Sequence, residues 1–327
     1  MSAPVVGTTE QTEYLGIHLD SIRVDSVLEF DLYLRVNGAM VLYRSADMPF
    51  TDRTHQKLMA NNVEQLFILT KNRPLYQRYI EKNLDKVLAD PEIEETKKAA
   101  ILYDTSTELV KDVLSNPTYG DNIQRSKDMV ANTISFILKG QEAFHSLVRI
   151  TSFDYYTYTH SVNVCTFSIA LAQQLGLDDE EFLHHLGTGA LLHDVGKSKI
   201  STSILNKKSS LTPQEFEIVK KHPKWGVDLL SESDDLDPVA LYPVLQHHER
   251  GDRGGYPDAL KLTEMHQASK IVAICDTFDA MTTRRVYQKA NDTFSTLKTM
   301  FALKGAYDEH YLQSLVQLMG PAGLKNS

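Results

Sequence analysis

The N-terminal part of the chain carries strand-like hydrophobic patterns. Residues 30–36 (FDLYLRV) alternate apolar and polar positions, and residues 39–44 (AMVLYR) form a matching apolar segment. Asn37-Gly38 lies between them and is typical of the tight turn of a β-hairpin. Residues 64–70 (EQLFILT) are a further strand candidate, with the composition of a buried strand.

Helical signals accompany these strands. Thr51 is placed to cap a helix that runs to about Ala60, and Pro74 opens a second helix with apolar residues at helical spacing. No constellation of catalytic side chains accompanies these elements. We therefore expect residues 1–90 to form a small α+β domain with a regulatory role.

The following stretch, residues 91–150, is predicted to be a mostly helical linker. Asn116-Pro117 and Gly120 interrupt it, as proline and glycine usually do. Its apolar residues recur at helical spacing and fit either an intramolecular core or the interface of a homodimer. These residues are Val130, Ile134, Ile137, Phe144 and Leu147.

Strand patterns are absent from the remainder, and residues 151–327 are predicted to form an all-α domain. One helix start is especially clear at Thr212-Pro213-Gln214-Glu215, which combines a capping hydroxyl, an N-terminal proline and a glutamate suited to a capping box. We expect this helix to carry His222 near its end.

Charge and composition narrow the function. The formal net charge is −9, with 43 acidic against 34 basic side chains, which disfavours a protein that binds long nucleic acids through a broad basic surface. An anionic substrate would need a local positive site, and bound metal ions supply one.

The chain also lacks the features of membrane or secreted proteins. Apolar runs fall short of the roughly 18 residues of a membrane span, and the N-terminus does not resemble a signal peptide. The two cysteines, Cys165 and Cys275, lie in apolar helical patterns and offer no disulfide framework. We therefore expect a cytoplasmic location without a membrane partner.

His193-Asp194 is the first candidate for chemistry. It ends an apolar helical run within GALLHDVGK and is followed by Lys197 one turn later. Adjacent helical side chains point about 100° apart, so both can bind one ion, or the carboxylate can bridge two ions. Taken alone, the pair also fits an aspartate that ends a helix beside a hydrogen-bonded histidine.

Further metal-binding side chains favour a metal site over this simpler explanation, because they come from several separate apolar helices. Imidazole and carboxylate together suit several divalent ions, and buried groups of this kind rarely stay unpaired. The additional candidates are His160, His222, His247, His248 and Asp276, with Asp279 one turn after Asp276.

The order and spacing of these residues resemble the HD-GYP group of HD phosphohydrolases, bacterial enzymes that hydrolyse the second messenger cyclic di-GMP. The resemblance covers about residues 153–290. The matching segments are His160, LLHDVGK (191–197), KKHPKWG (220–226), QHHER (246–250), GGYP (254–257) and CDTFDAMTT (275–283).

This resemblance implies a fold, a cofactor and a ligand set. It implies an all-α HD-type catalytic domain with two divalent ions, iron or manganese, in which Asp194 bridges the ions. By position, His160, His193, Asp194 and Asp276 hold one ion, and His222, His247 and His248 hold the second. Two such ions can generate a hydroxide from a shared water, and that hydroxide would attack the phosphodiester.

Other residues are expected to contact the substrate. Lys197 and Arg285 can neutralise charge on the phosphate or the leaving oxygen. Tyr256 of the Gly-Tyr-Pro loop can border a guanine pocket, and Arg253 can add a phosphate contact or narrow that pocket. The family further suggests that this loop contacts diguanylate cyclases.

The sequence departs from the family at Tyr156, where some members carry a glutamate that helps to hold a third metal. We therefore expect two ions. The predicted activity is hydrolysis of cyclic di-GMP to linear pGpG and further to GMP. The alternatives are a protein that binds cyclic dinucleotides with little turnover and an HD phosphohydrolase that acts on another nucleotide.

Overall fold

The computed structural model describes residues 13–117, 120–151, 157–233, 235–283 and 292–320. The chain forms two compact units, residues 1–93 and 94–327.

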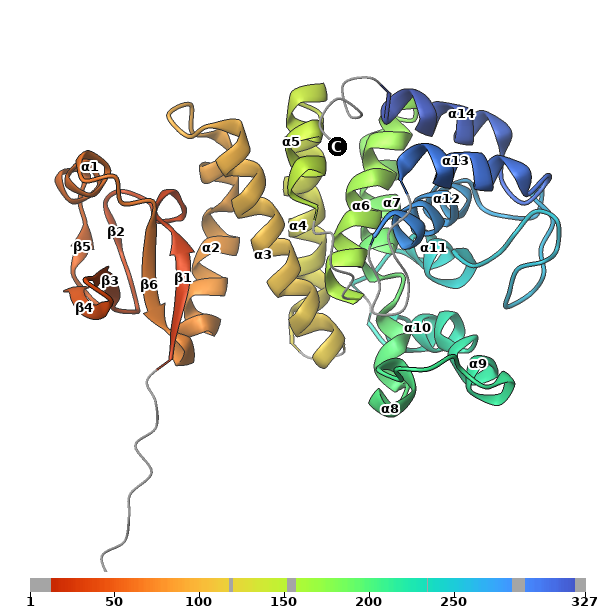
Figure 1. Ribbon diagram of the computed structural model, residues 1–327, viewed down its shortest axis with the longest axis horizontal. Coiled ribbons are helices and arrows are strands. Elements are labelled where there is room, and N and C mark those ends of the chain that lie inside the picture. Colours follow the sequence, from red (N-terminus) through yellow and green to blue (C-terminus); the bar gives the residue numbers. More distant parts are fainter. Residues whose placement is uncertain (1–12, 118–119, 152–156, 234, 284–291, 321–327) are drawn as a thin grey trace, which may run out of the picture. The chain divides into compact units, whose positions relative to one another are not determined.

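The described residues of the first unit, from residue 13 onward, form two small antiparallel sheets and two α-helices (Figure 1). Its four-stranded sheet has the order β1-β6-β3-β4, and β2 pairs with β5. The elements are β1 (Tyr14–His18), η1 (Leu19–Ser21), β2 (Ser26–Val27), β3 (Leu32–Val36), β4 (Ala39–Arg44), β5 (Pro49–Phe50), α1 (Asp52–Ala60), β6 (Gln65–Leu69), η2 (Thr70–Asn72) and α2 (Arg73–Ala89).

The predicted hairpin is confirmed. β3 pairs with β4 in antiparallel register, and Val36 faces Ala39 across the turn. Asn37 and Gly38 both have positive φ, 50° and 85°, which is why this asparagine-glycine pair favours the turn. Thr51 caps α1 by accepting a hydrogen bond from the backbone N–H of Thr54, as predicted.

The second unit is helical. Its described residues contain no strand, apart from an isolated bridge between Asp252 and Lys261. The elements are α3 (Glu95–Ser115), α4 (Asn122–Ile137), α5 (Gln141–Ile150), α6 (Thr157–Gln174), α7 (Glu180–Leu192), η3 (Val195–Lys199), α8 (Thr202–Leu205), α9 (Pro213–Val219), α10 (His222–Leu230), η4 (Pro238–Ala240), α11 (Leu241–Gln246), α12 (Gln267–Thr282), α13 (Thr293–Ala302) and α14 (Glu309–Leu318).

Helices α3, α4 and α5, which lie in the stretch predicted as a linker, belong to this helical unit. α3 packs against α5 and α6, and α4 packs against α7 (Figure 1). The apolar residues that fitted either a core or a homodimer interface are buried within the single chain: Val130, Ile134, Ile137, Phe144 and Leu147. They therefore form an intramolecular core, which removes the reason for expecting a homodimer through them.

The capping box at Thr212 is present. The Thr212 hydroxyl accepts from the backbone N–H of Glu215, whose carboxylate accepts from the backbone N–H of Thr212. The expected position of His222 was wrong, however. α9 ends at Val219 and His222 opens α10, because Pro223 fits the first turn of a helix and not its end.

Within the described part of the chain, no helix is both long enough and apolar enough to cross a bilayer.

Candidate metal centre

Seven histidine and aspartate side chains from five helices and their ends converge in the second unit. They form two groups, and within each group the candidate ligand atoms lie within 4.8 Å of one another. The first group is His160, His193 and Asp276, and the second group is Asp194, His222, His247 and His248. This is the set that the sequence predicts.

Local structure explains how each residue reaches the site. His193 is the C-cap of α7, and Asp194 follows it just before η3. His222 opens α10, whereas His247 and His248 directly follow α11. His160 and Asp276 lie within α6 and α12, which pack against each other.

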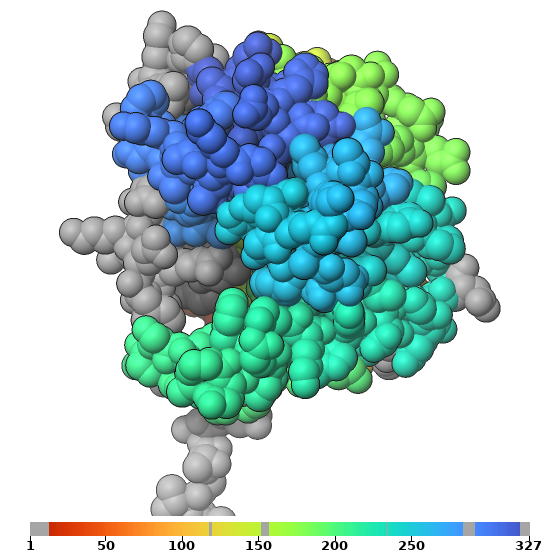
Figure 2. Space-filling model, turned by 90° about the vertical axis from the view of Figure 1, so that its right-hand side faces the viewer, coloured from red at the N-terminus to blue at the C-terminus, as the bar shows by residue number. Residues whose placement is uncertain are grey.

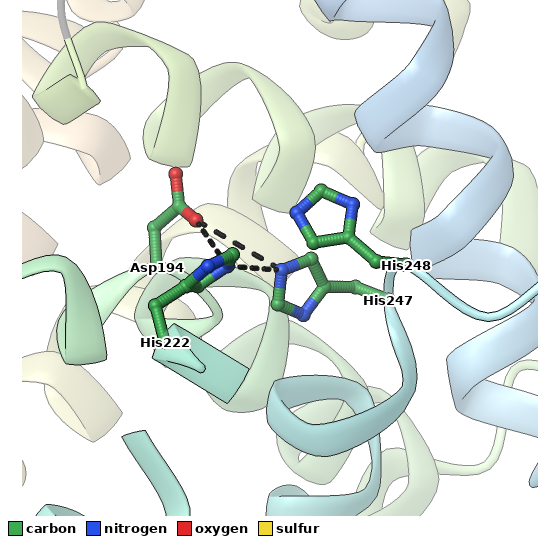
Figure 3. Close-up of side chains that lie close together, drawn as sticks. All are labelled: Asp194, His222, His247 and His248. Atoms are coloured by element: carbon green, nitrogen blue, oxygen red, sulfur yellow. Dashed lines mark hydrogen bonds and ion pairs between the residues drawn. The ribbon is translucent and has the colours of Figure 1, made fainter. Parts of the chain in front are cut away.

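The second group is the more compact of the two. Nε2 of His222 lies 3.0 Å from Nε2 of His247 and 3.3 Å from Oδ1 of Asp194. The same Asp194 oxygen lies 3.9 Å from Nε2 of His247. In Figure 3 these three side chains point toward one another, and His248 lies beside them. The ligand atoms of Asp194, His222 and His247 therefore point toward a common centre.

The first group adjoins the other carboxylate oxygen of Asp194 through His193. Nε2 of His160 lies 2.9 Å from Oδ1 of Asp276, and the rings of His160 and His193 are edge to face at 5.2 Å. Nε2 of His193 lies 3.5 Å from Oδ2 of Asp194. The two oxygens of Asp194 therefore face different groups, Oδ2 the first and Oδ1 the second.

The imidazoles are oriented by hydrogen bonds to the backbone. Nδ1 of His193 lies 2.7 Å from the carbonyl of Ala190, and Nδ1 of His222 lies 2.7 Å from that of Val219. Nδ1 of His247 lies 3.0 Å from the carbonyl of Val244. Because a carbonyl can only accept, each Nδ1 carries the proton and each Nε2 presents a lone pair to the centre.

His160 is oriented by a carboxylate. Its Nδ1 donates to Oδ2 of Asp279 at 2.6 Å, and Oδ1 of Asp279 accepts from the amide of Asn163 at 2.8 Å and the hydroxyl of Thr283 at 3.2 Å. Carboxylate–histidine pairs of this kind raise the basicity of a metal-binding imidazole. Asp279 was noted in the sequence only as a neighbour of Asp276, and its partner Asn163 was missed.

Burial and neighbouring charges set the protonation of the site. Burial lowers the pKa of His247 well below its usual value, and the neighbouring imidazoles lower it further. Burial opposes ionisation of Asp194, but Lys197 and His193 outweigh it and hold its pKa well below the usual range. The imidazole of His247 is thus neutral and the carboxylate of Asp194 charged near pH 7, the forms that bind metal.

The metal-free protein is expected to lose stability as the pH falls below about 6.5, the ordinary pKa of histidine. Unfolding releases His247 to its ordinary pKa, so between the folded and unfolded values the unfolded chain binds more protons. Urea unfolding of chelator-treated protein at pH 7.5 and pH 5.5 checks this. A His247→Asn variant should show a smaller difference between the two pH values; an equal difference would exclude this histidine as the cause.

Two polar atoms of the site have no hydrogen-bond partner among the described residues. They are Nε2 of His193 and Oδ1 of Asp194, both buried. Leaving such atoms unpaired costs free energy. Each belongs to a different ligand group, and a bound divalent ion would satisfy each of them. The donor set therefore fits two metal ions.

Close backbone packing brings together the segments that carry Asp194 and His222, two members of the second group. A Cβ on Gly196 would lie 2.0 Å from the carbonyl oxygen of His222 and 2.5 Å from the backbone nitrogen of Gly226. Only glycine allows η3, which follows Asp194, to lie against the first turn of α10.

A cavity of about 320 Å³ opens beside His247 and His248. It is lined by aromatic and cationic side chains together with the loop that contains Gly-Tyr-Pro. In Figure 2 the green segment with α9 adjoins the cyan segment of this loop. The lining residues are Phe216, Lys220, His247, His248, Glu249, Arg250, Gly254, Gly255, Tyr256, Thr277 and Tyr307.

The loop is held by a buried glutamate. Glu249 is 1% exposed and accepts hydrogen bonds from the backbone N–H groups of Asp258 and Leu260, at 2.6 and 2.9 Å. A Cβ on Gly255 would lie 2.5 Å from the carbonyl of His248, so the loop returns tightly onto the paired histidines. Tyr256 thereby packs on His248, with ring centroids 4.7 Å apart.

The structure places the expected substrate contacts as follows. Tyr256 lines the cavity, and Nζ of Lys197 lies 2.5 Å from Oδ2 of Asp194. Arg253 is exposed, lies 3.9 Å from Glu264 and is not among the residues that line the cavity. Arg250 lines it instead. Arg285 and Tyr156 lie outside the described residues.

Arg250, Phe216 and Lys220 were not recognised in the sequence as substrate contacts. Arg250 directly follows the His-His-Glu segment, which was the available signal for it. Phe216 and Lys220 lie one turn apart at α9 and its end, and nothing in their spacing distinguishes them from an ordinary helix surface.

Comparison with known proteins places this site in a family. The family model for the HD domain matches residues 128–311, more than half of the chain. A solved structure described as Bd1817, an HDG"Y"P protein from Bdellovibrio bacteriovorus, superposes with a TM-score of 0.65 and covers 94% of this chain and 99% of its own. At 24% identity this likeness concerns the fold.

Curated relatives include three phosphodiesterases. Cyclic di-GMP phosphodiesterase PA4108 of Pseudomonas aeruginosa is 34% identical over 69% of this chain and 55% of its own. Cyclic di-GMP phosphodiesterase of Thermotoga maritima is 35% identical over 50% and 45%. The 3'3'-cGAMP-specific phosphodiesterase 2 of Vibrio cholerae is 34% identical over 50% and 31%. The chain thus spans about half or less of the length of these relatives.

Together, the family match, the helical fold and the convergence of His193-Asp194 with the other ligands confirm the resemblance seen in the sequence. The chain belongs to the HD domain family, in its HD-GYP group.

Proposed function

We propose that this chain is a cyclic di-GMP phosphodiesterase with a two-metal centre. The observation that carries the proposal is the position of Asp194, whose two carboxylate oxygens face two separate groups of ligands. A carboxylate shared between two ligand groups would hold two ions close together, as two-metal phosphoesterases require. Curated relatives with this activity support the choice of substrate.

The first ion would be held by His160, His193 and Asp276, and the second by His222, His247 and His248, with Asp194 contacting both. The ligands suit iron or manganese, since nitrogen and oxygen donors are mixed and no thiolate is part of either group. When bound, the two ions would supply an activated water and neutralise charge on the phosphate.

The protein's own side chains complete the site. Lys197 carries a positive charge directly beside Asp194 and is 17% exposed, so it is placed to contact the phosphate or the leaving oxygen. Arg250 and Lys220 add positive charge at the cavity wall. Phe216 and Tyr256 provide aromatic faces on which a guanine can stack.

The cavity limits what the site can enclose. About 320 Å³ is near the lower end of the roughly 300–1,000 Å³ typical of small-molecule sites. This favours one nucleotide half of a cyclic dinucleotide in the cavity, with the scissile phosphate at the metals. Arg253 and Arg285 remain predicted contacts for the other half.

Two further expectations belong to this proposal. The Gly-Tyr-Pro loop is the predicted contact for diguanylate cyclases, and a cytoplasmic location fits the two buried free thiols, Cys165 and Cys275.

The test is product analysis on protein loaded with manganese or iron under anaerobic conditions. Cyclic di-GMP, 3'3'-cGAMP and a mononucleotide are supplied separately, and chelator-treated protein is the control. We expect cyclic di-GMP to be cut to linear pGpG faster than 3'3'-cGAMP, with no release of phosphate from the mononucleotide. Metal-loaded protein that binds cyclic di-GMP without cutting it would instead identify a binding protein.

A further inference from the structure

A chain of buried hydrogen bonds leads from helix α3 to the metal ligand His160. The hydroxyl of Tyr103 donates to Oδ1 of Asn163 at 3.1 Å, and the amide of Asn163 donates to Oδ1 of Asp279 at 2.8 Å. Oδ2 of Asp279 then accepts from Nδ1 of His160 at 2.6 Å. The chain thus connects α3, α6 and α12.

All four side chains are shielded from water. Tyr103 is 5% exposed, Asn163 and His160 are 1% exposed, and Asp279 is 2% exposed. Hydrogen bonds in such surroundings are strong, and a lost partner is not replaced by solvent. A change at Tyr103 therefore affects the geometry of His160 through this series of hydrogen bonds.

The direction of each bond follows from the chemistry of the groups. Asp279 is a carboxylate and accepts, so Asn163 must turn its NH₂ toward Asp279 and its oxygen toward α3. The Tyr103 hydroxyl fixes this orientation by donating to the amide oxygen. Without the hydroxyl the amide loses the bond that holds it in place, and Asp279 is less firmly positioned behind His160.

We propose that Tyr103 is a positioning residue that couples helix α3 to the first metal ion through Asn163, Asp279 and His160. This rests on the proposed function only in requiring a metal at the His160 group. α3 is the first element after the boundary between the two units at Ile93 and Glu94. Loss of this hydrogen-bond chain would therefore lower the affinity of the first ion more than that of the second ion.

The second group supports this selectivity. Its histidines His222 and His247 are oriented by the backbone carbonyls of Val219 and Val244, each three residues earlier, and not by side chains of α3. A structural disturbance of the whole domain would weaken the binding of both ions. A loss confined to the hydrogen bonds between Tyr103 and His160 would weaken the binding of the first ion.

The test is titration of metal-free protein with Co²⁺, followed by visible absorption and by competition with a chelator. Each titration is run on the full-length protein with and without the substitution His247→Ala, which removes a ligand of the second group alone. The variants are Tyr103→Phe, which keeps the ring, and Asp279→Asn. Ser106→Ala is the control, because Ser106 is a buried hydroxyl on α3 that bonds within its own helix, to the carbonyl of Leu102.

We expect Asp279→Asn to weaken the first ion by roughly 10–100-fold, as loss of a direct partner of a ligand does, and Tyr103→Phe to weaken it severalfold. Ser106→Ala should leave it unchanged. In the double variant that combines Tyr103→Phe with Asp279→Asn, the change at Tyr103 should add no further loss, since its effect passes through Asp279.

Additive losses in the double variant, equal weakening of both ions, or wild-type affinity in Tyr103→Phe would each overturn the coupling. If Tyr103→Phe does not fold, Asn163→Ser tests the same step from the next residue in the chain, with the same expected result. Hydrolysis is measured separately. Co²⁺ binding that depends on Tyr103 without any hydrolysis would refute the proposed function and support the coupling, whereas hydrolysis with no dependence on Tyr103 would do the reverse.

Discussion

Replacing Asp194 with asparagine is expected to lower the hydrolysis of cyclic di-GMP by at least about a hundredfold, the scale on which loss of one fixed electrostatic group lowers kcat. The substitution keeps the size of the side chain and removes the charge that faces both ligand groups. The measurement combines turnover with metal content per chain. Metal content should fall for both ions, because the carboxylate is shared between them.

A matched control is Asp228→Asn. Asp228 is an exposed aspartate on α10, the helix that His222 opens, and it belongs to neither ligand group. It should keep full activity and two ions per chain. Thermal unfolding of the metal-free variants separates a loss of metal binding from a loss of fold. Full turnover in folded Asp194→Asn protein would remove this residue from the mechanism.

Gly196→Ala is expected to damage both stability and the second ion. The added Cβ would meet backbone atoms of His222 and Gly226, which cannot turn aside as a side chain can. Overpacking of this kind typically costs about 1–3 kcal/mol in the free energy of unfolding. The strain falls on the segments that carry Asp194 and His222, so Mn²⁺ should bind more weakly at the second group. Urea unfolding and metal titration measure the two effects.

Two further substitutions serve as comparisons for Gly196→Ala. Ser198→Ala changes an exposed residue two positions further along η3 and should have little effect. Gly226→Ala should have an intermediate effect, since its Cβ would meet the Cγ1 of Val244, which can rotate. If Gly196→Ala matches Ser198→Ala in stability and in metal affinity, the close approach of η3 to α10 is not essential.

The ligand set could be predicted because its members are chemically distinctive. A histidine or aspartate that ends or interrupts an apolar helix is unusual, and His193-Asp194, His160 and Asp276 all have that signature. The resemblance to the HD-GYP group then implied the division into two groups. The structure adds the geometry that no pattern contains, namely which oxygen of Asp194 faces which group.

Residues that act behind the ligands left much weaker signals. Asn163 and Thr283 bond to Asp279 from positions 116 residues before it and 4 residues after it. Tyr103 lies 60 residues before its partner Asn163. Such contacts depend on how α3, α6 and α12 pack, and side-chain periodicity describes single helices and not their pairing.

The geometry of loops and helix ends could not be predicted from the sequence either. Arg253 was expected to add a phosphate contact or narrow the pocket, and Arg250 was not considered. In the structure Arg253 adopts a positive φ of 64° and lies near Glu264, whereas Arg250 lines the cavity. His222 was assigned to the wrong helix because the break after Val219 contains no glycine, and Pro223 was interpreted as a helix end. Similarly, the apolar pattern of residues 91–150 could not distinguish a core from an interface, and only burial did so.

The most direct test of the two-metal account is a crystal structure of manganese-loaded protein with anomalous scattering recorded at the manganese edge. We predict two peaks per chain, one among His160, His193 and Asp276 and one among His222, His247 and His248, with one oxygen of Asp194 bound to each. A single peak, or two peaks that do not share Asp194, would contradict the account.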